Sequence, residues 1–408
     1  MFKHSLLILA VSAGGAVCAP ALATEPAAPP ATTEPSGPTR EQPVWNAPDH
    51  VYSRFLVKGG AFHVLADDLT GDGRVDLAFT SHSGNLIQVY RQTAPRRFES
   101  MAAQEIVGFH PNDAIALPGA PKRYLINAEG DNQLRVVKAN ADGRLELVAN
   151  YPHQQPLGTT PFAWPEWGRL SLAVTPYTGS SITLLRDFDP EKGKAKATIT
   201  IPTDNDPRPA RLADLKGDGI PELVFPTFWS NKVWAIEFAG ADQTPIKREL
   251  AAFKEGWPRH VVPMDVNRDG KIDLLTPMSV QEQIAVLLND GQGQFTQSAP
   301  ITYPGRVGVH TLAVGEDRGG RYLLAGGSHA LVLYRERQEA TGQFDHRLLP
   351  ILNWPNRVKL IDVDGDKWLD AVVANQGQLE SQVIYGPLWD IFDKLAASPP
   401  GLLPPQLP

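Results

Sequence analysis

Short apolar runs separated by turn residues fill the chain from about residue 50 onward. One stretch shows the pattern well, because His260–Met264, Asp273–Pro277, Gln283–Leu288 and Gly293–Ala299 each have the length and composition of a β-strand. Asn289-Asp290-Gly291 has the composition of a tight turn between the last two. Similar groups of runs recur, and two matching acidic loops begin 294 residues apart, at six steps of 49. The recurrence predicts seven units of about four strands, a spacing typical of propeller blades.

A unit of this size cannot bury its own faces, whereas seven units stacked radially can. The predicted fold class is therefore all-β, a seven-bladed β-propeller over residues 48–386. The stretch 50–57 alternates apolar and polar residues and precedes the first unit, so we expect it to close the ring as the outer strand of the seventh blade. Residues 387–408 predict a short C-terminal helix and a Pro-rich tail. We interpret this helix as a cap packed on the propeller rather than as a segment that docks a partner.

The first 23 residues have the pattern of a signal peptide. Lys3 and His4 precede an apolar run, and Ala21-Leu22-Ala23 has the composition of a cleavage site. The apolar run is too short to span a bilayer, so we expect cleavage after Ala23, no transmembrane segment afterwards, and a periplasmic or secreted protein. Lipidation at Cys18, the only cysteine, is a rival interpretation that the preceding Val17 disfavours. Residues 24–47 are rich in Pro, Ala and Thr and predict a disordered tether.

Four acidic nine-residue segments stand out at 68–76, 214–222, 265–273 and 362–370. Side-chain oxygens occupy positions one, five and nine in all four, and position three in three of them. Such alternation directs oxygens toward one centre, which suits Ca²⁺. Each segment is followed by an apolar run typical of a strand, and Thr276 stands where an EF-hand would have its glutamate. The pattern predicts calcium loops between β-strands.

These loops, together with the run from Ile284 to Phe295 behind one of them, resemble the FG-GAP/VCBS repeat family. The resemblance covers about residues 50–386. Four blades carry the loop motif, whereas three share only the spacing of the strands, and an intact F-G-G-A-P string is not present. It implies a seven-bladed propeller, as in integrin α subunits, with Ca²⁺ between the first and second strands of a blade. It implies no single activity, because the fold hosts many functions.

The resemblance also implies the metal ligands. The complete sets are Asp68, Thr70, Asp72 and Asp76 with the Arg74 carbonyl; Asp265, Asn267, Asp269 and Asp273 with the Lys271 carbonyl; and Asp362, Asp364, Asp366 and Asp370 with the Trp368 carbonyl. The loop at 214–222 keeps Asp214, Asp218 and Glu222, but Lys216 stands at position three. Its ammonium could replace the cation by pairing with Asp214 and Asp218, so metal binding there stays open. We expect the role of Ca²⁺ to be structural.

A candidate ligand site emerges five or six residues before the loops, where the innermost strands begin. The residues at these positions are His63, Arg208, Arg259, His260 and Arg357, and the sixth blade, aligned through its strand at 321–324, adds Arg306 and His310. They predict a polar-to-basic arc at the mouth of the central channel, opposite the metal loops. Aromatic residues precede it at Trp257, Tyr303 and Trp354, which suits an anionic or sugar-like ligand. The alternative interpretation is a polar, hydrated channel mouth that binds no ligand. A metal site formed by three histidines is a further alternative, which the sequence favours less.

The net charge of −7 and the absence of basic runs argue against a nucleic-acid partner. No common catalytic motif is present, and acidic pairs occur only in the metal loops, so no catalytic residue is assigned. The sequence thus favours an exported, calcium-stabilised module that binds a glycan or a protein surface. One alternative is a lyase or hydrolase acting on acidic polysaccharide at the channel mouth, and another is a scaffold that docks through its tail.

Overall fold

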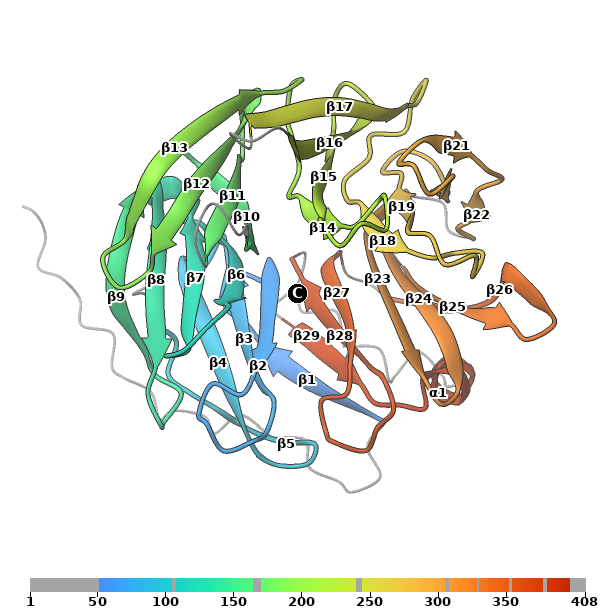
Figure 1. The fold of residues 1–408 in the computed structure, drawn as a ribbon. Coiled ribbons are helices and arrows are strands. Elements are labelled where there is room, and N and C mark those ends of the chain that lie inside the picture. Colours follow the sequence, from blue (N-terminus) through green and yellow to red (C-terminus); the bar gives the residue numbers. More distant parts are fainter. Residues whose placement is uncertain are drawn as a thin grey trace, which may run out of the picture. The chain divides into compact units, whose positions relative to one another are not determined.

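The computed structural model describes residues 51–104, 108–163, 170–239, 244–304, 308–328, 330–351, 354–376 and 380–396. Seven antiparallel sheets form a ring, so the predicted seven-bladed β-propeller is confirmed (Figure 1). The predicted signal peptide, Cys18, the tether and the Pro-rich tail lie outside the described residues, as does Arg306. No helix in the described ranges is long and apolar enough to cross a membrane.

Each blade is a meander whose strands pair in chain order, except at the closure of the ring and at the outer edge of blade five. Blade one contains β2 (His63–Asp67), β3 (Asp76–Ser81), β4 (Leu86–Ala94) and β5 (Arg97–Ser100). Blade two contains β6 (Pro111–Leu117), β7 (Arg123–Ala128), β8 (Gln133–Ala139) and β9 (Leu145–Pro152), with the short 3-10 helix η1 (Glu129–Asp131) after β7. Blade three contains β10 (Pro156–Phe162), β11 (Ser171–Pro176), β12 (Ser181–Asp189) and β13 (Lys194–Pro202).

The remaining blades follow the same plan. Blade four contains β14 (Arg211–Ala213), β15 (Glu222–Thr227), β16 (Lys232–Ala239) and β17 (Thr244–Ala252). Blade five contains β18 (Val262–Met264), β19 (Asp273–Pro277), β20 (Gln283–Asn289), β21 (Phe295–Gln297) and β22 (Ile301–Thr302). Blade six contains β23 (Val309–Asp317), β24 (Gly320–Gly327), β25 (Ala330–Arg337) and β26 (Ala340–Pro350). Blade seven contains β27 (Pro355–Ile361), β28 (Asp370–Asn375), β29 (Glu380–Ile384) and, from the start of the chain, β1 (Tyr52–Leu56).

The ring closes as expected, because β1 pairs antiparallel with β29 as the outer strand of blade seven. Tyr52 lies opposite Ile384 and Leu56 opposite Glu380, and the side chains of Arg54 and Glu380 form an ion pair. In blade five the expected outer strand over 293–299 is divided into β21 and β22, both of which pair with β20. Pro300 lies between them and has no N–H to continue the ladder.

The hydrophobic core lies between neighbouring blades, since each sheet packs its two faces against the next sheets. One cluster joins Leu65 and Ala78 of blade one to Tyr124 and Ile126 of blade two. The helix α1 (Leu388–Ala396) packs against β25 and β26 and buries Trp389 and Phe392, which places it as the packed cap favoured by the sequence.

Candidate functional site

The four acidic loops connect the first and second strands of blades one, four, five and seven, where the resemblance places them. In three of them the carboxylate at position nine is fully buried and accepts hydrogen bonds from the loop backbone. Asp76 accepts from Leu69 N at 3.0 Å, Asp273 from Val266 N at 2.9 Å and Asp370 from Val363 N at 2.8 Å. These side chains therefore shape the loops as well as supplying oxygens.

The loop of blade seven fits a cation best. Ligand oxygens of Asp362, Asp364 and Asp370 lie within 4.8 Å of one another. Burial, together with the negative charges of Asp364 and Asp366, raises the pKa of Asp370 to about 7. Converging carboxylates of this kind suit Ca²⁺, although Arg96 of blade one already pairs with Asp364 and, at 3.1 Å, with Asp366.

The loop of blade four contains its own cation. Lys216 Nζ lies 3.3 Å from Glu222 and 2.8 Å from Glu237. The expected pairing of this ammonium with Asp214 and Asp218 is therefore wrong; Asp214 instead accepts from the backbone N–H groups of Asp218 and Gly219. Because Lys216 is paired with the position-nine side chain, this loop is less suited to Ca²⁺ than the other three.

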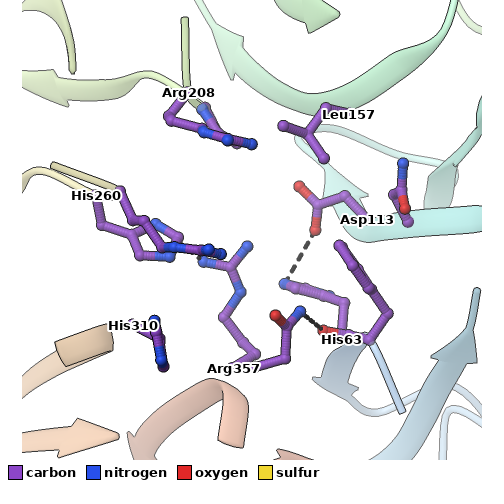
Figure 2. A pocket seen from close by; sticks show the side chains of 12 residues that line it. His63, Asp113, Leu157, Arg208, His260, His310 and Arg357 are labelled. Carbon is purple, nitrogen blue, oxygen red and sulfur yellow. Dashed lines mark hydrogen bonds and ion pairs between the residues drawn. The ribbon is translucent and has the colours of Figure 1, made fainter. Parts of the chain in front are cut away.

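At the other end of the first strands lies a cavity of about 50 Å³ (Figure 2). All seven blades contribute to it, and its lining residues are Phe62, His63, Asn112, Asp113, Leu157, Arg208, Pro209, Arg259, His260, His310, Asn356 and Arg357. Six of the seven residues predicted at the channel mouth thus surround one cavity, and the seventh, Arg306, lies outside the described residues. The common position at the start of each first strand explains why they meet.

A histidine–aspartate pair joins blades one and two at this cavity. His63 Nε2 lies 2.9 Å from Asp113 Oδ1, and both side chains are buried (Figure 2). Burial lowers the pKa of His63 to about 4 in spite of the neighbouring carboxylate. Burial alone would raise the pKa of Asp113, but His63 and the charges of Arg357 and Arg211 hold it well below its usual range. A neutral His63 with its proton on Nε2 would direct it toward Asp113, while Nδ1 has no hydrogen-bond partner among the described residues.

Cationic groups outnumber carboxylates around the cavity. Burial is the largest cause that lowers the pKa of Arg259 and of Arg357 to about 10 and that of Lys359 to about 8, and neighbouring guanidinium groups add to each shift. With Arg208 and Arg211, the described network holds five cationic side chains, against the carboxylates of Asp113, Asp206 and Asp67. The excess is two positive charges, which favours an anion in the cavity.

Two further histidines contribute neutral polar groups. Burial and the surrounding arginines hold the pKa of His260 well below its usual range, and burial lowers that of His310 to about 4. Arg357 Nη1 lies 3.4 Å from His260 Nδ1. The three-histidine metal site is not formed, because His63, His260 and His310 do not gather within 4.8 Å in the part of the chain described.

Exposed aromatic rings border the same end of the blades. Phe109, Trp257 and Trp354 come just before first strands, whereas Tyr177 and Trp229 follow second strands. Trp354 also stacks on His310, with ring centroids 4.8 Å apart. Tyr303 differs from the expectation, because it is buried and donates its hydroxyl to the carbonyl of Ala330 at 2.8 Å.

Several residues of the site were missed from the sequence. Asp113 immediately follows Asn112, and Lys359 lies two residues beyond Arg357, on the same side of β27. The strand alternation could have found Lys359. Arg211 and the aromatic residues after the second strands carry no comparable signal.

No family model matches the chain, and no curated protein is similar to it in sequence. Solved structures are similar in fold. Virginiamycin B lyase from Staphylococcus aureus matches with a TM-score of 0.54 and 12% identity, over 81% of this chain and 98% of the other. BBS1N, crystallised in complex with ARL6DN, matches with a TM-score of 0.57 and 10% identity, over 81% and 94%. The chain is thus a seven-bladed β-propeller; its assignment to the FG-GAP/VCBS type stays a prediction.

Proposed function

We propose that the protein is a binding module that recognises an acidic carbohydrate at the mouth of its central channel. The excess of cationic side chains around a cavity shared by all seven blades carries this proposal. Buried cations without matching carboxylates cost folding free energy, and a bound anion offsets that cost. Guanidinium groups such as those of Arg208 and Arg357, both directed into the cavity, bind carboxylates with forked hydrogen bonds (Figure 2).

The size of the cavity and its surroundings favour a sugar acid. A volume of about 50 Å³ admits a carboxylate with a few atoms around it, but not a whole saccharide. The remainder of the ligand would therefore lie across the face, where Tyr177, Trp229, Trp257 and Trp354 expose ring surface. Aromatic rings bind the apolar faces of flat or cyclic ligands while their edges stay hydrated.

Calorimetric titration with an oligosaccharide of uronic acids tests the proposal. The fully methyl-esterified form of the same oligosaccharide is the matched ligand, because it keeps the ring faces and lacks the charge. We expect binding of the acid, at least a 10-fold weaker affinity for the ester, and a similar loss in Arg357→Gln. Arg97→Gln, which changes an exposed residue of β5, is expected to bind like the wild type. Equal binding of acid and ester, or none of either, rejects the proposal.

A second candidate function, a lyase acting on the same ligand class, is supported by the pair of His63 and Asp113. His63 Nε2 lies 2.9 Å from Asp113 Oδ1, so a His63 with its proton on Nε2 keeps Nδ1 available to accept another proton. In an elimination, Nδ1 would take the proton next to the carboxylate, the electron pair would form a carbon–carbon double bond, and the glycosidic oxygen would leave and take a proton from water. Appearance of unsaturated product, lost in His63→Gln, would assign catalysis. Binding without product leaves the module a binder.

We also propose that Ca²⁺ binds the loops at 68–76, 265–273 and 362–370 and stabilises the propeller. The support is the side-chain pattern of these loops and the convergence of Asp362, Asp364 and Asp370. Export through the predicted signal peptide would bring these loops to a calcium-rich compartment. Sequencing the N-terminus of the mature protein tests that export, with Thr24 as the expected first residue.

A further inference from the structure

We propose that His82, His110 and Glu129 form a binding site for a transition-metal dication, Zn²⁺ in the first instance, at the rim of the channel mouth. Ligand atoms of the three residues lie within 4.8 Å of one another. His82 follows β3, His110 precedes β6 and Glu129 follows β7, so blades one and two build the site together.

The side chains are held in place by packing and hydrogen bonds. The rings of His82 and His110 stack with centroids 4.2 Å apart, and Phe62 and Phe109 lie against their outer faces at 5.5 and 4.0 Å. Glu129 is buried, and its Oε2 lies 3.0 Å from His82 Nε2 and accepts from Asn112 Nδ2 at 3.1 Å. The carboxylate is thus oriented by a second residue, as is usual for metal ligands.

The backbone of His110 is held in a defined conformation. Its φ is +49°, in the left-handed region that non-glycine residues seldom adopt. Hydrogen bonds hold this conformation, because His110 N donates to Asn85 Oδ1 at 2.9 Å and Glu129 N donates to the carbonyl of His110 at 3.2 Å. Gln155 and Trp257 share this conformation and donate their N–H groups to Asn132 and Asn231, so it is a repeated feature of the blades that fixes the position of His110.

The chemical types of the three ligand side chains determine which metal ions the site would prefer. Two imidazoles and one carboxylate suit Zn²⁺ and its neighbours in the first transition series, whereas Ca²⁺ prefers oxygen ligands alone. Three protein ligands leave at least one coordination position open. Phe62 and Asn112, which contact the cluster, also line the central cavity, so the cluster borders the channel mouth.

The experiment titrates the tag-free mature protein with ZnCl₂ by calorimetry in excess Ca²⁺, which keeps the acidic loops filled. Absorption of the Co²⁺ form in the visible range provides a second readout that does not depend on any activity. Two variants preserve the local structure. His82→Gln keeps a donor toward Glu129, and His110→Asn keeps a residue that tolerates a positive φ. His346→Asn, an exposed histidine on β26, is the matched control.

We expect one Zn²⁺ per chain in the wild type and in the control, and a loss of affinity of about 100-fold in each of the two variants. A visible Co²⁺ spectrum should appear in the wild type and vanish in the variants. Absence of stoichiometric Zn²⁺ binding in the folded wild type overturns the proposal, as does binding unchanged in both variants. Neither result bears on the acidic-carbohydrate site, because that site is measured with a different ligand and with Arg357→Gln.

Discussion

Arg357 and Lys359 are charged residues whose burial at the proposed binding site costs folding free energy. They lie on the same side of β27, and both have lowered pKa values, chiefly because burial disfavours their charge. Asp113 offsets part of this lowering, whereas Arg211 lowers both pKa values further. A chain optimised for folding alone would place uncharged residues here. The cost is consistent with a site kept for an anion.

Replacement of Lys359 by methionine tests whether the buried ammonium lowers the free energy of unfolding. The folded-state pKa is about 8 against an ordinary 10.5, so the ammonium is ionised at pH 7 at a cost to folding. We expect Lys359→Met to raise the free energy of unfolding at pH 7 by about 2 kcal/mol in urea denaturation. The stability of the wild type should rise between pH 8 and 10, because the unfolded state then binds more protons, and the variant should lose this rise. Lys254→Met, at an exposed position, is the control; a less stable Lys359→Met contradicts the argument.

His310 predicts sensitivity to acid. Its pKa is lowered to about 4 by burial and by Arg259, and Ser328 Oγ lies 2.9 Å from its Nε2. The unfolded histidine takes up a proton near pH 6.5, so stability present above that pH is lost as the pH falls toward 4. The loss attributable to His310 is about 3 kcal/mol at most. Denaturation midpoints between pH 7 and 4 should fall less steeply in His310→Gln than in the wild type, whereas His346→Gln should match the wild type.

Among the elements, β1 has the largest consequence for the architecture, because it joins the two ends of the described propeller. Its Phe55 is 2% exposed and contacts the rings of Phe79, Tyr90 and Phe98 at centroid distances of 5.6, 4.9 and 5.1 Å. These rings belong to blade one, whereas β1 itself extends the sheet of blade seven. The strand therefore joins the two blades by backbone pairing and by side-chain packing.

Truncation of Phe55 to alanine should weaken this closure. Loss of a fully buried phenylalanine costs about 3 to 5 kcal/mol, through lost transfer free energy and the cavity that remains. The neighbouring Leu56→Ala, at a position 36% exposed, is expected to cost less than about 1 kcal/mol. Guanidinium denaturation measures both values. Equal effects of the two substitutions would show that the β1–β29 pairing matters more than the packing of Phe55.

At the scale of the molecule, the sequence predicts more of the architecture than of the site. The period of the acidic loops and the alternation around Phe55 suffice for the ring and for its closure, since both are repeated backbone patterns. Alignment on the loops also finds His63, His260 and Arg357, and alignment on a strand of blade six finds His310, because equivalent positions of the blades meet at the axis. The contacts of Lys216 and the cluster around Glu129 could not be predicted, because they depend on side chains from other strands or the next blade.

The same repetition separates two kinds of site along each first strand. In blade one, β2 begins at His63 beside the cavity and ends at Asp67, just before the acidic loop. Calcium bound in the proposed loop would therefore lie several residues away from a ligand in the cavity, at the other end of the strand. Stability and binding should respond to different ions.

Removal of calcium is the test at this scale. A chelator should lower the melting temperature, because each loop filled at 100 times its dissociation constant adds about 2.7 kcal/mol to the free energy of unfolding. Asp265→Ala should reduce the calcium-dependent shift by removing one of the three loops, whereas Asp142→Ala, at an exposed turn, should leave it unchanged. Below the lowered melting temperature, affinity for the acidic oligosaccharide should stay within about twofold of the calcium-loaded value. A melting temperature indifferent to the chelator would reject the calcium loops. Loss of ligand binding in the folded, calcium-free protein would instead show that the two ends of the first strands are coupled through the blades.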